Sequence, residues 1–137
     1  MKWFKIDGKE WNVNVIEISE SFSILYSENT GRTMAKGAPL TLDPLGTFWG
    51  HKMVVGRKRG EVNDFDKLFN YIAIPRYDGM TVVLPHDQKT MQYKAYVSTG
   101  ERKVKKIIEE VDGEIKEVIY DTYPINFIAT EAQVLPE

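Results

Sequence analysis

The sequence predicts a mainly β protein: a β-sandwich or barrel of about seven strands, with one short flanking α-helix at about 64–73 and a long loop at about 27–45. Three observations predict this fold class. Apolar and polar residues alternate along most of the chain, which is the spacing of half-buried strands. One segment alone changes to helical spacing. The chain has 137 residues, 42% hydrophobic and 28% charged, so we expect a single domain, 1–137, with its own core.

The amino-terminal part predicts a hairpin followed by a bulged strand. Residues 2–6 form a short first strand, and the Asp7-Gly8 pair after it is typical of a two-residue turn. The second strand begins near Trp11, and its alternation shifts by one residue at the Val15-Ile16 doublet. Such a shift turns the later side chains to the other face, so we expect a β-bulge or a strong bend there. The alternating residues are Trp11, Val13 and Val15 before the shift, and Ile16, Ile18, Phe22 and Ile24 after it.

Further strands are predicted at about 46–58, 80–84 and 89–98. The last two runs, about 101–111 and 114–129, flank Asp112-Gly113, a second hairpin signal. Pro124 lies inside the final run. Because proline cannot donate a hydrogen bond to a ladder, we expect an edge position or another bulge at this residue.

The segment with helical spacing runs from Asn63 to Ala73. Its apolar residues recur at i, i+3, i+4 and i+7 and define one stripe that must pack on a sheet: Phe65, Leu68, Phe69 and Ile72. Asn63 or Asp64 is a candidate N-cap. Pro75 predicts that the helix ends at or before Ile74.

The connection at 27–45 is the most informative segment. It has two glycines, two prolines and no convincing periodicity, and a structureless connection of this length is uncommon in a compact domain. It is also too apolar for a flexible linker, because it carries Met34, Leu40, Leu42 and Leu45. Two interpretations stay open: the loop packs on its own domain, or it becomes ordered by packing on a neighbouring subunit.

Few residues carry recognisable chemistry. The chain has no cysteine, which excludes disulfides and thiolate metal sites and is typical of a protein made in a reducing cytoplasm. Its two histidines, His51 and His86, are interpreted as structural or solvated, because no metal-binding motif accompanies them. The GRKRG segment at 56–60 lacks the ending of a phosphate-binding loop. We therefore expect no enzymatic activity, no cofactor and no metal. No run approaches the roughly 18 apolar residues that span a bilayer, so we expect no membrane partner.

The formal net charge is −2, but the charge is strongly segregated. Residues 32–59 carry six basic and one acidic group, whereas 107–137 carry one basic and eight acidic groups. Basic and acidic strands could lie side by side in one sheet, or two faces of opposite sign could meet between subunits. A third interpretation is an oligonucleotide-binding barrel, in which cations at 57–59 and 102–106 and nearby aromatic residues bind a single strand.

Four stretches resemble a family of small structural proteins in long-tailed bacteriophages and prophages. They are YSENTGRTMAKGAPLTLDPLGTFWGHK (26–52), DFDKLFNYIAIP (64–75), VLPHDQKTMQYKAYVSTGERKV (83–104) and YPINFIATEAQVLP (123–136). The order of elements is similar to that of phage tail-tube proteins, in which a helix flanks a β-sandwich or barrel and a long loop reaches the adjacent ring. This chain is shorter than many tube proteins and ends soon after its last strand, which leaves open a role at the distal tail or the head–tail junction.

The resemblance implies a non-enzymatic virion protein of the tail, made in the cytoplasm of the bacterial host. Its partners would be further copies of itself, in rings or stacks, and other tail proteins. DNA would pass transiently through a lumen, for which the acidic segment 107–121 is a candidate lining. The candidate subunit-interface residues are Arg32, Met34, Leu40 and Leu42 in the long loop, and Arg57 and Lys58 outside it.

Overall fold

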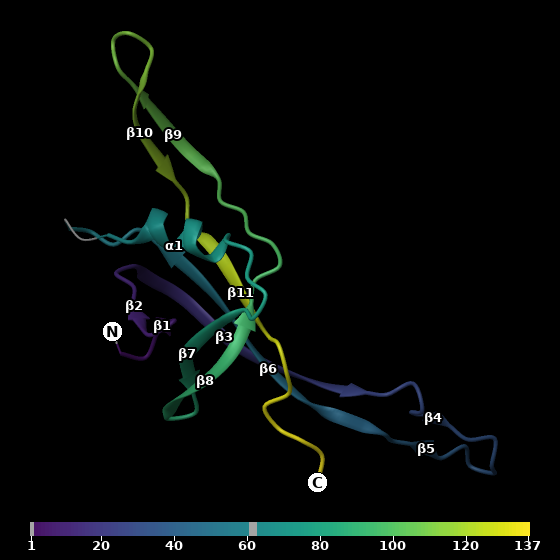
Figure 1. Ribbon diagram of the computed structural model, residues 1–137. Coiled ribbons are helices and arrows are strands. Elements are labelled where there is room, and N and C mark those ends of the chain that lie inside the picture. Colours follow the sequence, from purple (N-terminus) through teal and green to yellow (C-terminus); the bar gives the residue numbers. More distant parts are fainter. Residues whose placement is uncertain (1, 61–62) are drawn as a thin grey trace.

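The computed structural model describes residues 2–60 and 63–137, and in these residues the chain is mainly β with one helix (Figure 1). The elements in chain order are β1 (Lys5–Ile6), β2 (Lys9–Glu10), β3 (Asn14–Tyr26), β4 (Gly31–Arg32), β5 (Leu40–Thr41), β6 (Pro44–Gly56), α1 (Phe65–Ile72), β7 (Met80–His86), β8 (Lys89–Tyr96), β9 (Val104–Glu109), β10 (Ile115–Tyr120) and β11 (Tyr123–Ala129). The predicted fold class is confirmed.

Seven strands form the main sheet, in the order β2-β1-β7-β8-β11-β6-β3, and its neighbours are antiparallel. The sheet curls on itself. Glu20 of β3, at one edge, lies 2.6 Å from the ring nitrogen of His86 at the end of β7, although three strands separate β3 from β7 in the order. Curling lets the two halves of the sheet face each other across a shared core, as in a sandwich or partly open barrel.

Alternate residues of the facing strands make up the core. Val82 and Leu84 of β7 point inward from one half, and Met53, Ile125 and Phe127 of β6 and β11 point inward from the other. This burial follows the period-two pattern of the sequence, because successive side chains of a strand point to opposite faces.

Helix α1 covers the place where the curled sheet is open. Strand β11 pairs with β8 only at Ile128 and Ala129, so the start of β11 has β6 alone as a neighbour. Tyr123 fills this opening: its ring lies 4.8 Å from that of Phe65, and its hydroxyl donates a 2.8 Å hydrogen bond to the Phe65 carbonyl. Burial raises the pKa of this hydroxyl above its ordinary value, which keeps it protonated and able to donate.

The helical prediction is confirmed. The predicted four-residue stripe faces the sheet, as its spacing requires. Three of its residues are buried, namely Phe65, Leu68 and Ile72, and the fourth, Phe69, packs against the core. Asp64 is the N-cap residue, but its carboxylate accepts a hydrogen bond from the Asn12 backbone N–H rather than capping the helix.

Two local predictions in the amino-terminal part are also confirmed. Asp7 and Gly8 both adopt positive φ angles, 52° and 78°, in the turn between β1 and β2, as a type I′ hairpin turn requires. In the β3–β6 ladder Val15 pairs with Val55 and Glu17 with Val54, so Ile16 is the extra residue of a β-bulge.

Two expectations need correction. The run 114–129 is not one strand: β10 pairs with β9 in a separate two-stranded sheet, and β11 joins the main sheet. The connection 27–45 is not structureless, because β4 and β5 pair within it. The edge position expected at Pro124 is present locally: Pro124 pairs with Val54 of β6 without a bulge, and among the described residues β11 has no second neighbour there.

Replacing Leu68 with alanine tests how α1 is held. Leu68 lies on the inner face of α1 and is fully buried. We therefore expect Leu68→Ala to lower the free energy of unfolding by about 2–5 kcal/mol, measured by urea denaturation. The matched control is Lys67→Ala, one residue away on the exposed face of the same helix, which we expect to change it by less than about 0.5 kcal/mol. Equal effects of the two variants would contradict the packing described here.

Candidate assembly surfaces

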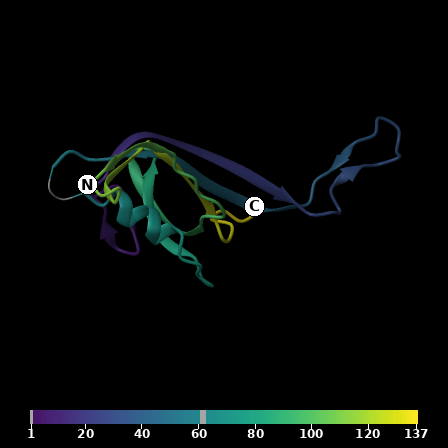
Figure 2. The same cartoon turned by 90° about the horizontal axis from the view of Figure 1, so that it is seen from above.

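The segment 27–45, here called the arm, projects away from the body of the protein (Figure 2). It continues the β3–β6 ribbon, whose register runs from Asn14 opposite Gly56 to Tyr26 opposite Pro44. Strand β6 has β3 on one side. On the other side it pairs with β11 and, further toward the arm, with Val134, which lies opposite Thr47. Beyond Thr47 the ribbon has two strands only among the described residues, so the body no longer supports it.

Hydrogen bonds across the arm hold it as a hairpin. The backbone N–H of Ser27 donates to the Asp43 carbonyl at 2.9 Å, and that of Thr33 donates to the Pro39 carbonyl at 2.9 Å. The Asp43 backbone N–H donates to the Thr30 hydroxyl, also at 2.9 Å. These bonds join the two sides of the arm, while most of its side chains remain exposed.

The apolar side chains of the arm are uncovered. Met34 is fully exposed, and Leu40 and Leu42 keep 46% and 56% of their surface accessible. The arm therefore does not pack on its own domain, which was one of the two interpretations of the sequence. Several exposed apolar side chains on one short segment commonly mark a contact with another molecule.

The arm continues an open strand edge. Strand β3 is the last strand of the main sheet, and its outer edge pairs with no other strand in residues 2–60 and 63–137. Phe22 and Leu25, on the outer half of this strand, are also largely exposed. A long unpaired edge with apolar side chains is a template for a further strand.

The structure brings four of the six predicted interface residues together. Arg32, Met34, Leu40 and Leu42 all lie on the arm, where the Arg32 guanidinium donates to the Ala38 carbonyl at 3.3 Å and braces the hairpin.

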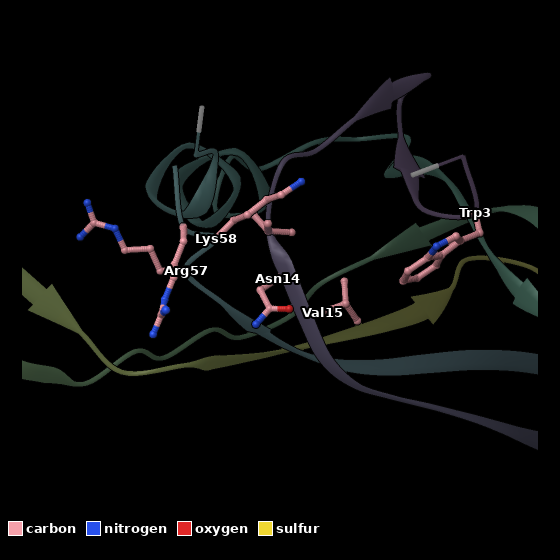
Figure 3. Close-up of a pocket in the computed structure, with 7 residues that line it drawn as sticks. Trp3, Asn14, Val15, Arg57 and Lys58 are labelled. Carbon is pink, nitrogen blue, oxygen red and sulfur yellow. The ribbon is translucent and has the colours of Figure 1, made fainter. Parts of the chain in front are cut away.

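Arg57 and Lys58 lie elsewhere, just after the opposite end of β6. Because Asn14 pairs with Gly56, the residues after Gly56 continue beside the start of β3. They line an open hollow of about 460 Å³ together with Trp3, Val13, Asn14, Val15 and Arg59 (Figure 3). This basic hollow, as it is called below, has apolar side chains on its floor and three cations on its rim.

Sequence reasoning missed a second projection. Strands β9 and β10 form a two-stranded hairpin, here called the acidic hairpin, that extends from the body in Figure 1. Val104, Ile107, Val111 and Ile115 are exposed on it. The Asp112-Gly113 turn signal identified the hairpin, but the run 114–129 concealed that β10 leaves the main sheet.

The two histidines meet at one place in the curled sheet. His51 is buried, and its Nε2 lies 2.8 Å from the Pro85 carbonyl oxygen, which can only accept a hydrogen bond. Its Nδ1 therefore accepts from the Tyr93 hydroxyl, 2.7 Å away. Both ring nitrogens are thus engaged in bonds between β6 and the opposite half of the sheet, which agrees with a structural histidine. Burial raises the pKa of Tyr93 and keeps its proton in place.

Glu20 completes this cluster from β3. Its Oε2 lies 2.6 Å from His86 Nδ1 and 3.3 Å from His51 Nε2. The hydrogen bond with Glu20 raises the pKa of His86 above its ordinary value near 6.5, and the negative charges of Glu20 and Asp87 raise it further. This contact joins the free edge of the sheet to β7.

Within the described ranges, no group of three or more His, Asp or Glu side chains is placed to hold a metal ion. Among the same residues, no helix is long and apolar enough to cross a membrane.

The fold and its surfaces define a mainly β domain that carries two projecting hairpins and an open strand edge. No protein-family model matches this sequence, and neither a curated protein nor a solved structure matches it.

Replacing Glu20 with glutamine tests the histidine cluster. We expect Glu20→Gln to lower the pKa of His86 toward 6.5, measured by NMR titration of the His86 ring protons, because the charged acceptor is lost. The control Asp87→Asn removes the more distant carboxylate and changes the pKa less. Because the folded pKa of His86 is raised, this contact stabilises the fold below about pH 6.5. Its contribution disappears as the pH rises through the folded pKa, so Glu20→Gln destabilises the protein more at pH 5.5 than at pH 8.

Proposed function

We propose that this chain is a non-enzymatic structural protein of the virion of a long-tailed bacteriophage or prophage. In this proposal it is a component of the tail, either of the tube or of a tube-like hub or connector. Copies join into rings through the open edge of β3 and the arm, and rings or other tail proteins stack on them. The protein is made in the cytoplasm of the bacterial host, and DNA passes through the lumen of the finished assembly.

The observation that carries this proposal is the uncovered arm. Met34, Leu40 and Leu42 are held on an ordered hairpin that its own body does not cover. Burying one such side chain in a contact contributes about 1.5–3 kcal/mol of binding free energy. A partner that covers all three side chains would therefore be bound substantially more tightly. The resemblance of residues 26–52 to phage tail proteins supports the same role for the arm.

The histidine cluster supports a structural role over a catalytic one. A general base needs a ring nitrogen that is available to a substrate, whereas both nitrogens of His51 are bonded inside the sheet. The bonds from β6 and β3 to β7 instead brace the curled sheet.

An oligonucleotide-binding barrel is the alternative function. The observation that favours it is the basic hollow, in which Trp3 lies beside Arg57, Lys58 and Arg59, since single strands bind to cations and aromatic rings together.

A polar arm variant tests the assembly proposal. The triple variant Met34→Ser, Leu40→Ser, Leu42→Ser keeps the hairpin backbone and removes its apolar surface. We expect self-association to weaken by about 100-fold or more, measured by light scattering across a concentration series and by electron microscopy of rings. The stability of the monomer remains within about 1 kcal/mol, because all three side chains are solvent-exposed.

The matched control carries the same kind of change away from the arm. Tyr77 and Leu135 are also exposed, so Tyr77→Ser with Leu135→Ser is expected to leave association unchanged. A wild-type chain that stays monomeric across the whole concentration series would overturn the proposal.

Oligonucleotide binding separates the two functions. We expect fluorescence anisotropy with a labelled 20-nucleotide single strand to show no binding below about 100 μM at 150 mM salt. Tight binding whose affinity falls steeply with salt, and which is lost in Lys58→Glu, would favour the barrel alternative.

A further inference from the structure

The acidic hairpin and the basic hollow are complementary, and neither is used by the contact proposed for the arm. We propose that the tip of the acidic hairpin of one copy docks in the basic hollow of a second copy. This inference rests on the self-assembly proposed above but uses a different pair of surfaces, one of which the sequence had suggested as a lumen lining.

The tip of the hairpin combines one apolar side chain with surrounding carboxylates. Val111 is fully exposed at the turn, a position that polar residues usually occupy. Glu109, Glu110, Asp112 and Glu114 surround it in the sequence and are exposed as well. The tip is therefore an apolar knob with four negative charges around it.

The basic hollow has the matching arrangement. Val13 and Val15 lie on its floor with Trp3 at the side, and Lys58 and Arg59 are exposed on its rim. In Figure 3 Asn14 and Val15 lie between the side chains of Trp3 and Arg57. An apolar floor inside a cationic rim fits an apolar knob inside an anionic ring, and such charge complementarity steers association and fixes orientation.

The two surfaces of one chain cannot meet each other. Arg57 holds the hairpin at its middle, where its guanidinium lies 3.6 Å from the Glu117 carboxylate of β10. Beyond this contact the hairpin continues away from the body, and its tip lies far from the start of β3 and the end of β6, which border the hollow (Figure 1). The tip reaches the hollow of its own copy only if the hairpin folds back and loses its backbone pairing, so the occupant is a second copy.

This contact would also stabilise the acidic hairpin itself. An isolated two-stranded hairpin is marginally stable in water, and β9 and β10 pair with no other strand in the described part of the chain. Docking would cover its apolar tip. Because tip and hollow are different surfaces, the contact is head-to-tail, and head-to-tail contacts close into rings when the rotation between copies permits.

Charge reversal with mixing tests the inference. The hollow variant is Lys58→Glu with Arg59→Glu, and the tip variant is Glu110→Lys with Glu114→Lys. Asp112 is left unchanged, because its carboxylate accepts the Glu114 backbone N–H and holds the turn. We expect each variant alone to self-associate about tenfold more weakly than wild type by analytical ultracentrifugation. An equimolar mixture of the two restores association to within about threefold, since a basic tip then meets an acidic hollow.

The control is Lys89→Glu with Lys94→Glu on β8, away from both surfaces, which changes the net charge by the same amount as the hollow variant. We expect it to associate as wild type does. Because the chain has no cysteine, a second measurement uses two single-thiol variants, Val111→Cys and Lys58→Cys. Mixed in equal amounts under oxidising conditions, they are expected to form the mixed disulfide dimer in clear excess over the 1:2:1 proportion that random pairing gives.

The outcomes separate this inference from the proposed function. If neither charge variant weakens association while the polar arm variant does, the docking inference is overturned and arm-based assembly stands. If the mixture does not recover, or the mixed dimer does not exceed the proportion that random pairing gives, the pairing of tip with hollow is wrong. If the hollow variant loses binding to a single-stranded oligonucleotide but associates normally, the hollow is a polyanion site and the inference fails.

Discussion

The antiparallel pairing of β3 with β6 is the constraint on which the rest of this structure depends. One half of the ribbon lies in the body, where Met53 and Val55 of β6 are fully buried, and the other half leads into the arm. The bulge at Ile16 sets the register of the ladder beyond it, and the pairing of Asn14 with Gly56 places Arg57 beside Val13 at one end and the arm at the other. Core, basic hollow and arm are therefore positioned by one set of backbone hydrogen bonds.

The sequence predicted those features that local spacing determines. The Val15-Ile16 doublet revealed the bulge, and the recurrence of Phe65, Leu68 and Ile72 revealed the helix, because both signals involve neighbours in the chain. Strands β4 and β5 escaped prediction because two residues are too few to show a period. The end of β10 at Tyr120 escaped it because Asp121 and Thr122, which separate β10 from β11, do not interrupt the alternation in a way that spacing detects.

The candidate surfaces were predictable only in part. Three of the four interface residues of the arm, Met34, Leu40 and Leu42, stood out as apolar side chains in a segment that also carries glycine and proline. The basic hollow could not be predicted without the fold, because strand register and not sequence spacing brings Val13 and Arg57 together. The same is true of the contact between Glu20 and His86, which are 66 residues apart and meet because the sheet curls. Long-range geometry of this kind leaves no local signal.

The position of β6 has a mechanical consequence. Its outer end belongs to the arm, and its inner end lies between β3 and β11 in the middle of the fold. Both strands of the ribbon lead into the arm, so a pull on the arm acts on β3 and β6 together and loads the β6–β11 ladder lengthwise. Strands sheared in this direction resist separation far better than strands peeled apart one bond at a time, so the hydrogen bonds between β6 and β11 would bear traction on the arm.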